Sequence, residues 1–179
     1  MFKKMALFIL TALTLVAGCG SPQSANVDRP DEVLHSVTRH EYKSIAEIKS
    51  DSTLVARVVA STRKGKEIDG VPFTVTRVLV REVLHGKTER GHMSIIQLGS
   101  DKVASLDTSR LLKNGQEYVL FLTEYHLTPG DRTGMHTIVG EQGIYRLVDS
   151  GRYEFASGSH SRLPEALRPR EITALRTAR

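Results

Sequence analysis

The chain has 179 residues, of which 40% are apolar, so it can form one domain with a modest core and terminal appendages. Its formal net charge is +5, a mild excess with no basic run interleaved with aromatic residues, which argues against a nucleic-acid partner. A single cysteine excludes an intramolecular disulfide, so the core alone must stabilise the fold.

The N-terminal segment has the pattern of a secretory signal. Lys3 and Lys4 give it a basic start, and an apolar stretch follows at residues 5–18. This stretch has 14 residues, whereas a membrane-spanning helix needs about 20, so it is too short to remain as a membrane helix. Removal of residues 1–18 would leave 23 basic and 20 acidic residues, a net charge of +3.

Residues 15–19 read LVAGC, an aliphatic residue and small residues before the cysteine. This motif resembles the lipobox of bacterial lipoproteins. The resemblance implies diacylglyceryl transfer to the Cys19 sulfur, cleavage after Gly18, and N-acylation, for instance with palmitate. Two or more acyl chains hold a protein stably on a membrane, so Cys19 would be the anchor. The alternative is an ordinary secretory signal in which Cys19 happens to lie near the cut.

The resemblance also bears on localisation. Gly20, and not Asp, follows Cys19, which in this family favours the outer membrane where a cell has two membranes. We therefore expect a lipid anchor in the cell membrane or the outer membrane, on the extracytoplasmic side. Residues 19–40 are rich in Ser, Pro, Asn and Asp and have no sustained period, which is typical of a flexible tether. Such a tether of ~20 residues reaches roughly 25 Å.

Residues 41–160 are expected to form the folded domain. Ser44 can cap a short helix at residues 44–50, because Glu47 stands three residues further on. The polar segment at residues 64–70 contains two glycines and is predicted to be a turn. Strands are predicted where β-branched and apolar residues recur between turn signals, at residues 53–61, 73–84, 93–98, 117–123, 136–139, 143–148 and 153–155.

The segment at residues 73–84 has apolar residues of both parities. Phe73 and Val75 share one parity, while Val78 and Val80 share the other, which predicts a bulge near Arg77. Short strands with few helical segments predict a mainly β domain, an all-β barrel or sandwich.

The C-terminal residues 161–179 are locally basic. Pro169 is placed to open a short helix, and Ile172 and Leu175 share one face of it. We favour a docked or frayed terminal helix over an interaction tail.

Three segments carry a resemblance at the level of the fold: VLVREVLHG at 78–86, LKNGQEYVLFL at 112–122 and GEQGIY at 140–145. They resemble a class of bacterial lipoproteins and exported domains. Their domain looks like a small OB-type barrel of about five to six strands, of the netrin or metalloproteinase-inhibitor kind, here with a short helix at each end. The inhibitors need an N-terminal cysteine fixed against the barrel by disulfides. Because Cys19 is alone and separated by a tether, that mechanism does not carry over.

The sequence has no motif of a metal site or of nucleophilic catalysis. No two of the seven histidines are spaced i, i+4 as on a zinc-binding helix, and none lies beside a cysteine ligand. There is no Gly-x-Ser-x-Gly elbow and no P-loop. Ser159 and His160 are adjacent, and neighbours on an extended chain point to opposite faces. We therefore expect no cofactor, no metal and no enzymatic activity.

Two polar pairs are candidate surface contacts. Arg81 and Glu82 are interpreted as charges on an edge strand, which discourage sheet-to-sheet aggregation. Glu141 and Gln142 precede Gly143 at the end of a strand, where they could serve either binding or structure.

The function predicted is a non-catalytic binding or accessory role in the cell envelope, with an envelope protein or glycan as partner. One alternative is an envelope hydrolase whose site is not visible in sequence order. The other is an oligosaccharide-binding barrel, which would need exposed aromatic residues on one face. The candidates for that role are Tyr118, Tyr125, Tyr145 and Tyr153.

Overall fold

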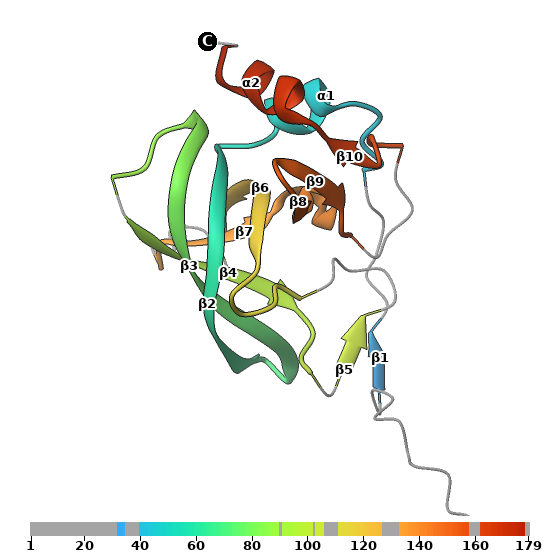
Figure 1. Ribbon diagram of the computed structural model, residues 1–179. Coiled ribbons are helices and arrows are strands. Elements are labelled where there is room, and N and C mark those ends of the chain that lie inside the picture. The colour runs from blue at the N-terminus through green and yellow to red at the C-terminus, as the bar shows by residue number, and fades with distance from the viewer. Residues whose placement is uncertain are drawn as a thin grey trace, which may run out of the picture.

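A computed structural model describes residues 32–34, 40–89, 91–101, 103–105, 111–126, 133–157 and 162–177. The fold is mainly β, as predicted, with one mixed sheet of eight strands and a short helix towards each end (Figure 1). The predicted signal peptide with Cys19, and the Ser159–His160 pair, lie outside the described residues.

Five strands of the large sheet form a closed ring. In ring order they are β2 (Leu54–Ile68), β3 (Val71–Gly86), β4 (His92–Leu98), β7 (Met135–Ile138) and β6 (Glu117–Glu124). Four of the five pairings are antiparallel. The fifth joins β4 to β7 in parallel and closes the ring.

The inside of the ring is a hydrophobic core built by strand alternation. In β2 every second residue from Leu54 to Ala60 is buried, and Tyr118, Leu120 and Leu122 of β6 are buried in the same cluster. Side chains of one parity therefore fill the ring, and those of the other parity face outwards.

The irregularities of the β2–β3 pair differ from the prediction. Thr74, Thr76 and Val78 are all buried, so β3 keeps one inward parity past Arg77 and no bulge forms in it there. At this level the extra residue is Ser61 of β2, because Ala60 pairs with Val78 and Thr62 with Arg77. The polar threonines continue the inward face, which the apolar pattern could not show.

The predicted turn at residues 64–70 is wrong. β2 continues to Ile68, and the turn consists of Asp69 and Gly70, with φ of 51° and 77°. An Asp-Gly pair with positive φ is typical of a two-residue hairpin whose twist matches that of the strands. The second half of β2 resembles a loop in the sequence, because it is mostly exposed and has no apolar alternation.

Three further strands extend the sheet beyond β6. They are β8 (Ile144–Asp149), β9 (Arg152–Phe155) and β10 (Ala166–Leu167), and the predicted hairpin of β8 and β9 is confirmed. The short 3-10 helix η1 (Val139–Glu141) connects the ring to β8. A separate parallel pair joins β5 (Val103–Ser105) to β1 (Glu32–Leu34), which falls in the predicted tether.

Both predicted helices are present, and they lie side by side over one end of the sheet (Figure 1). In α1 (Ile45–Ser50) the Ser44 Oγ accepts a hydrogen bond from the Glu47 amide at 3.2 Å, as the capping pattern predicts. In α2 (Pro169–Thr177) Ile172 and Leu175 are buried in the second core cluster. The C-terminal helix is therefore docked.

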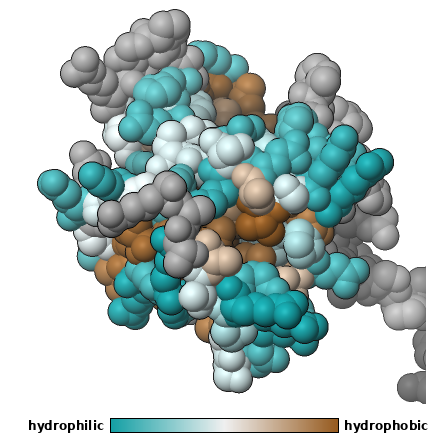
Figure 2. Space-filling view, turned by 90° about the horizontal axis from the view of Figure 1, so that it is seen from above, coloured by the Kyte–Doolittle hydropathy of each residue, from teal (hydrophilic) through white to brown (hydrophobic). Residues whose placement is uncertain are grey.

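Polar side chains cover most of the face seen from above, with apolar ones exposed in patches between them (Figure 2). Within the described ranges neither helix has the length and apolar character needed to cross a membrane.

Candidate functional site

Glu82 and Arg81 lie on a stretch of β3 that pairs only with β2 among the described strands, which agrees with an edge position. Glu82 also has specific partners. It accepts hydrogen bonds from Arg57 at 3.0 Å and from Arg176 of α2 at 2.7 Å. Its carboxylate therefore attaches the C-terminal helix to the sheet, a role that the sequence did not indicate.

Glu117 of β6 connects three strands through its carboxylate, because its partners lie on β2 and β9. Arg57 donates to it at 3.0 Å, and the Tyr153 hydroxyl donates to the same oxygen. Partial burial raises the pKa of Glu117, but the hydrogen bonds from Tyr153 and Arg57 and the charge of Arg57 outweigh burial, so the pKa is lowered overall. Burial and the bond to Glu117 raise the pKa of Tyr153 to about 12. This network joins β2, β3, β6, β9 and α2. Its side chains therefore serve to hold these elements together.

Gln142 is a structural residue. Its side chain is 1% exposed, its Oε1 accepts from the Tyr42 amide at 3.2 Å, and its Nε2 donates to the His40 carbonyl at 2.8 Å. The preceding Gly140 and Glu141 have φ of 54° and 57°, a left-handed turn that directs Gln142 inwards. Gln142 thus fastens the start of the folded domain to the ring.

The tyrosines do not form an exposed aromatic face. Tyr118, Tyr145 and Tyr153 are each at most 2% exposed, so they cannot stack on a sugar. Tyr125 is half-buried, and its ring lies edge-on to that of Phe73, with centroids 6.5 Å apart.

The described histidines do not form a cluster, and two of them contact a single glutamate each. His40 contacts Glu47 at 2.7 Å and His126 contacts Glu124 at 3.4 Å. Among the described residues, no three His, Cys, Asp or Glu side chains gather where they could hold a metal ion.

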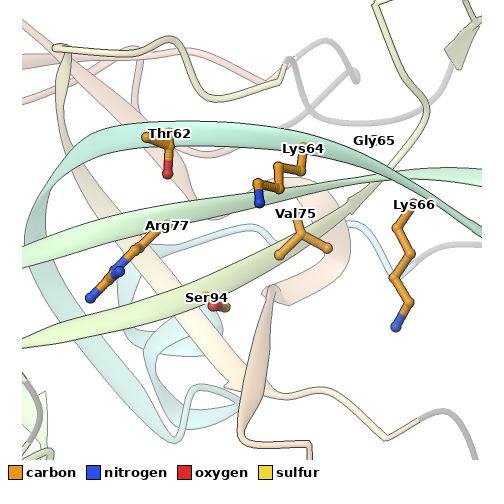
Figure 3. A pocket seen from close by; sticks show the side chains of 7 residues that line it. All are labelled: Thr62, Lys64, Gly65, Lys66, Val75, Arg77 and Ser94. Carbon is orange, nitrogen blue, oxygen red and sulfur yellow. The ribbon is translucent and has the colours of Figure 1, made fainter.

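The candidate site is a hollow on the outer side of three neighbouring strands (Figure 3). Its volume is about 410 Å³. We call it the basic hollow, and it is lined by Thr62, Lys64, Gly65, Lys66, Val75, Arg77 and Ser94.

Strand register brings the lining residues together. Thr62 of β2, Arg77 of β3 and Ser94 of β4 form one row across the strands, because Arg77 pairs with both of the others. Lys64 pairs with Val75 in the next row. Side chains two residues apart share a face, so Thr62, Lys64 and Lys66 project on the same side of β2.

The charges of β2 are separated between its two faces. Arg63, which alternates with the lining residues, is paired with Asp101 at 3.0 Å. No carboxylate lines the basic hollow, and no ion pair links Lys64, Lys66 or Arg77 to a carboxylate of the residues that the structure describes. These cations are therefore available to an external anion. The sequence signal for this face is the Thr-x-Lys-x-Lys alternation at residues 62–66, which the polar, glycine-containing composition of residues 64–70 obscures.

A second hollow, beside β9 and α2, is larger at about 660 Å³ but differs in charge. Its lining carries three arginines and three glutamates, and two of the arginines are paired, Arg152 with Glu154 and Arg170 with Glu171. The basic hollow therefore remains the stronger candidate site. No protein-family model matches the chain, and no curated protein matches it in sequence.

Proposed function

We propose that this protein is a bacterial lipoprotein anchored through lipid on Cys19 to the extracytoplasmic side of the cell membrane or outer membrane, where its β domain binds a ligand without catalysis. The anchor rests on the LVAGC motif behind a basic and apolar leader. The basic hollow carries the binding function, because it combines an open concave surface with cations that lack described acidic partners.

The lining favours binding over catalysis. It includes two hydroxyl groups, on Thr62 and Ser94, but no imidazole and no carboxylate, the groups that most often act as general bases. A hydroxyl without a base is a weak nucleophile, whereas it can readily donate a hydrogen bond to a ligand.

We also propose that the five-stranded ring is an OB-type barrel. In the ring, β7 comes before β6, the reverse of their order in the chain. This order supports the proposal, since an OB fold is a five-stranded Greek-key barrel. OB barrels bind ligands on the face of their second and third strands. In the ring these are β3 and β4, which contribute Val75, Arg77 and Ser94 to the basic hollow.

The anchor is tested by Cys19→Ser in bacterial cells, with Ser21→Ala as a control that keeps the motif intact. We expect the wild type and the control to be in the membrane fraction and to incorporate a fatty-acid analogue. Cys19→Ser should be unlabelled and released into the soluble fraction, because the thiol that receives the lipid is gone. A Cys19→Ser protein that stays membrane-bound and labelled would overturn the assignment.

A further inference from the structure

We propose that the basic hollow binds a linear polyanionic glycan, a saccharide chain that carries repeated carboxylate, phosphate or sulfate groups. This inference rests on the proposed binding function and adds the chemical class of the ligand.

The arrangement of the cations favours a chain over a single ion. Arg77 is level with Thr62, Lys64 lies two residues further along β2, and Lys66 two residues beyond that. At a strand rise of about 3.4 Å per residue, these levels are about 7 Å apart and span about 14 Å in total. Figure 3 shows the same order, with Arg77 and Lys66 at opposite ends and Lys64 between them. A row of charges of this length matches successive anionic groups.

The three cations have complementary roles. The Arg77 guanidinium can hold one carboxylate, sulfate or phosphate through two parallel hydrogen bonds. The Lys64 and Lys66 ammonium groups are point charges on flexible stems, so they tolerate variable spacing between the next anionic groups. All three are on an exposed face, and the described part of the chain offers them no ion pair that a ligand would have to break.

The uncharged lining fits a sugar. Thr62 and Ser94 flank Arg77 in the same row, where their hydroxyls can exchange hydrogen bonds with sugar hydroxyls. Val75 provides an apolar contact in the next row. None of the seven lining residues is aromatic, so an anionic glycan would be held by charge and hydrogen bonds instead of by ring stacking. Single-stranded nucleic acid, whose bases stack on aromatic side chains, would lack that platform here.

The test uses the whole mature chain made soluble by Cys19→Ser. The probes are oligogalacturonate and dextran sulfate, which are anionic, and neutral dextran. The site variant is Lys64→Gln/Lys66→Gln/Arg77→Gln. The control is Lys43→Gln/Lys87→Gln/Lys113→Gln, which removes the same net charge from exposed positions outside the hollow. Equal melting temperatures of the two triple variants would show that both are folded.

We expect the anionic glycans to bind the parent protein and the control variant, and to bind more weakly as salt is raised. Each single hollow substitution should weaken binding roughly 3- to 5-fold, and the triple variant by tens of fold, as for partly exposed ion pairs. Neutral dextran should not bind.

Equal loss in the two triple variants, or no loss in either, would overturn the basic hollow as the site. Hollow-dependent binding that is confined to single-stranded DNA, to vesicles of anionic phospholipid or to inorganic phosphate would overturn the glycan assignment. In those cases the proposed binding function would stand, so the two failures are distinguishable. Equal binding of neutral dextran would overturn the requirement for charge.

Discussion

At the scale of single residues, Glu117 shows how one carboxylate can stabilise several strands. It lies on β6, and its partners Arg57 and Tyr153 come from β2 and β9. Each partner favours the charged carboxylate, and this lowers its pKa despite partial burial. A group whose folded pKa is lowered stabilises the fold above its unfolded pKa of about 4.5, and that contribution is lost as the pH falls through the folded value.

Tyr153→Phe should therefore destabilise the protein in a pH-dependent way. We expect a loss of about 1–2 kcal/mol in the free energy of unfolding near pH 7, because a hydrogen bond to a charged group is removed. The loss should shrink as the pH falls below about 4.5 and through the lower folded pKa of Glu117, where the carboxylate of the folded protein becomes protonated. Tyr118→Phe is the control, since its hydroxyl accepts from the Lys113 amide and contacts no carboxylate. Urea titrations from pH 3 to 7 measure both, and parallel curves for the two variants would contradict the prediction.

Gln142→Ala should be among the more damaging polar substitutions. It removes the partners of the Tyr42 amide and the His40 carbonyl and leaves a cavity in the core, so we expect a loss of about 2–4 kcal/mol. Gln116→Ala is the comparison, because that side chain is half-buried and its main bond is to the Leu147 carbonyl. Thermal unfolding should show the larger shift for Gln142→Ala, and equal shifts would argue against its fastening role.

At the scale of elements, α2 is held by three kinds of contact. Its apolar face places Ile172 and Leu175 in the core, Arg176 binds Glu82, and the Lys49 ammonium donates to the Leu175 carbonyl at 2.8 Å. A cation at the C-terminal end of a helix satisfies carbonyls that lack a partner within the helix. The short helix is therefore stabilised mainly by its docking.

Leu175→Ala should cost about 2–4 kcal/mol, because it opens a cavity between α2 and the sheet. Arg170→Ala, on the exposed side of the same helix, should change stability by less than about 0.5 kcal/mol. Chemical denaturation measured by circular dichroism would distinguish them. A negligible cost for Leu175→Ala would mean that the helix contributes little to the fold.

The hairpin of β2 and β3 shows the limit of pattern-based prediction at this scale. The inner half of β2 is apolar and was recognised, whereas the outer half carries Lys64, Lys66 and Glu67 and was not. A strand that faces water on both sides has no apolar period, so only its two-residue Asp-Gly turn identifies it. The basic hollow lies on that half, and this is why the sequence did not predict the candidate site.

At the scale of the molecule, the β class, the two helices and the β8–β9 hairpin could be predicted from alternation, capping and turn residues. Ring closure could not, because it depends on β4 meeting β7, a parallel pair of segments about 40 residues apart in the chain. The roles of Glu82, Glu117 and Gln142 could not be predicted either, because their partners come from elements far away in the sequence.

β7 should be the least protected strand of the ring. It forms three residue pairs with β4 and three with β6, against six between β2 and β6. Hydrogen exchange followed by mass spectrometry should therefore show faster exchange in peptides covering β7 than in those covering the buried part of β2. Uniform protection of both would indicate that the ring opens only on global unfolding.

The outer half of β2 has one more consequence, for self-association. After Ser61 this strand pairs only with β3 among the described strands, so its other edge presents backbone groups to which a foreign strand could add. Two copies aligned along that edge would bring their lysine pairs, Lys64 and Lys66, into mutual repulsion. The same ammonium groups that attract an anion thus oppose the growth of a continuous sheet between neighbouring molecules.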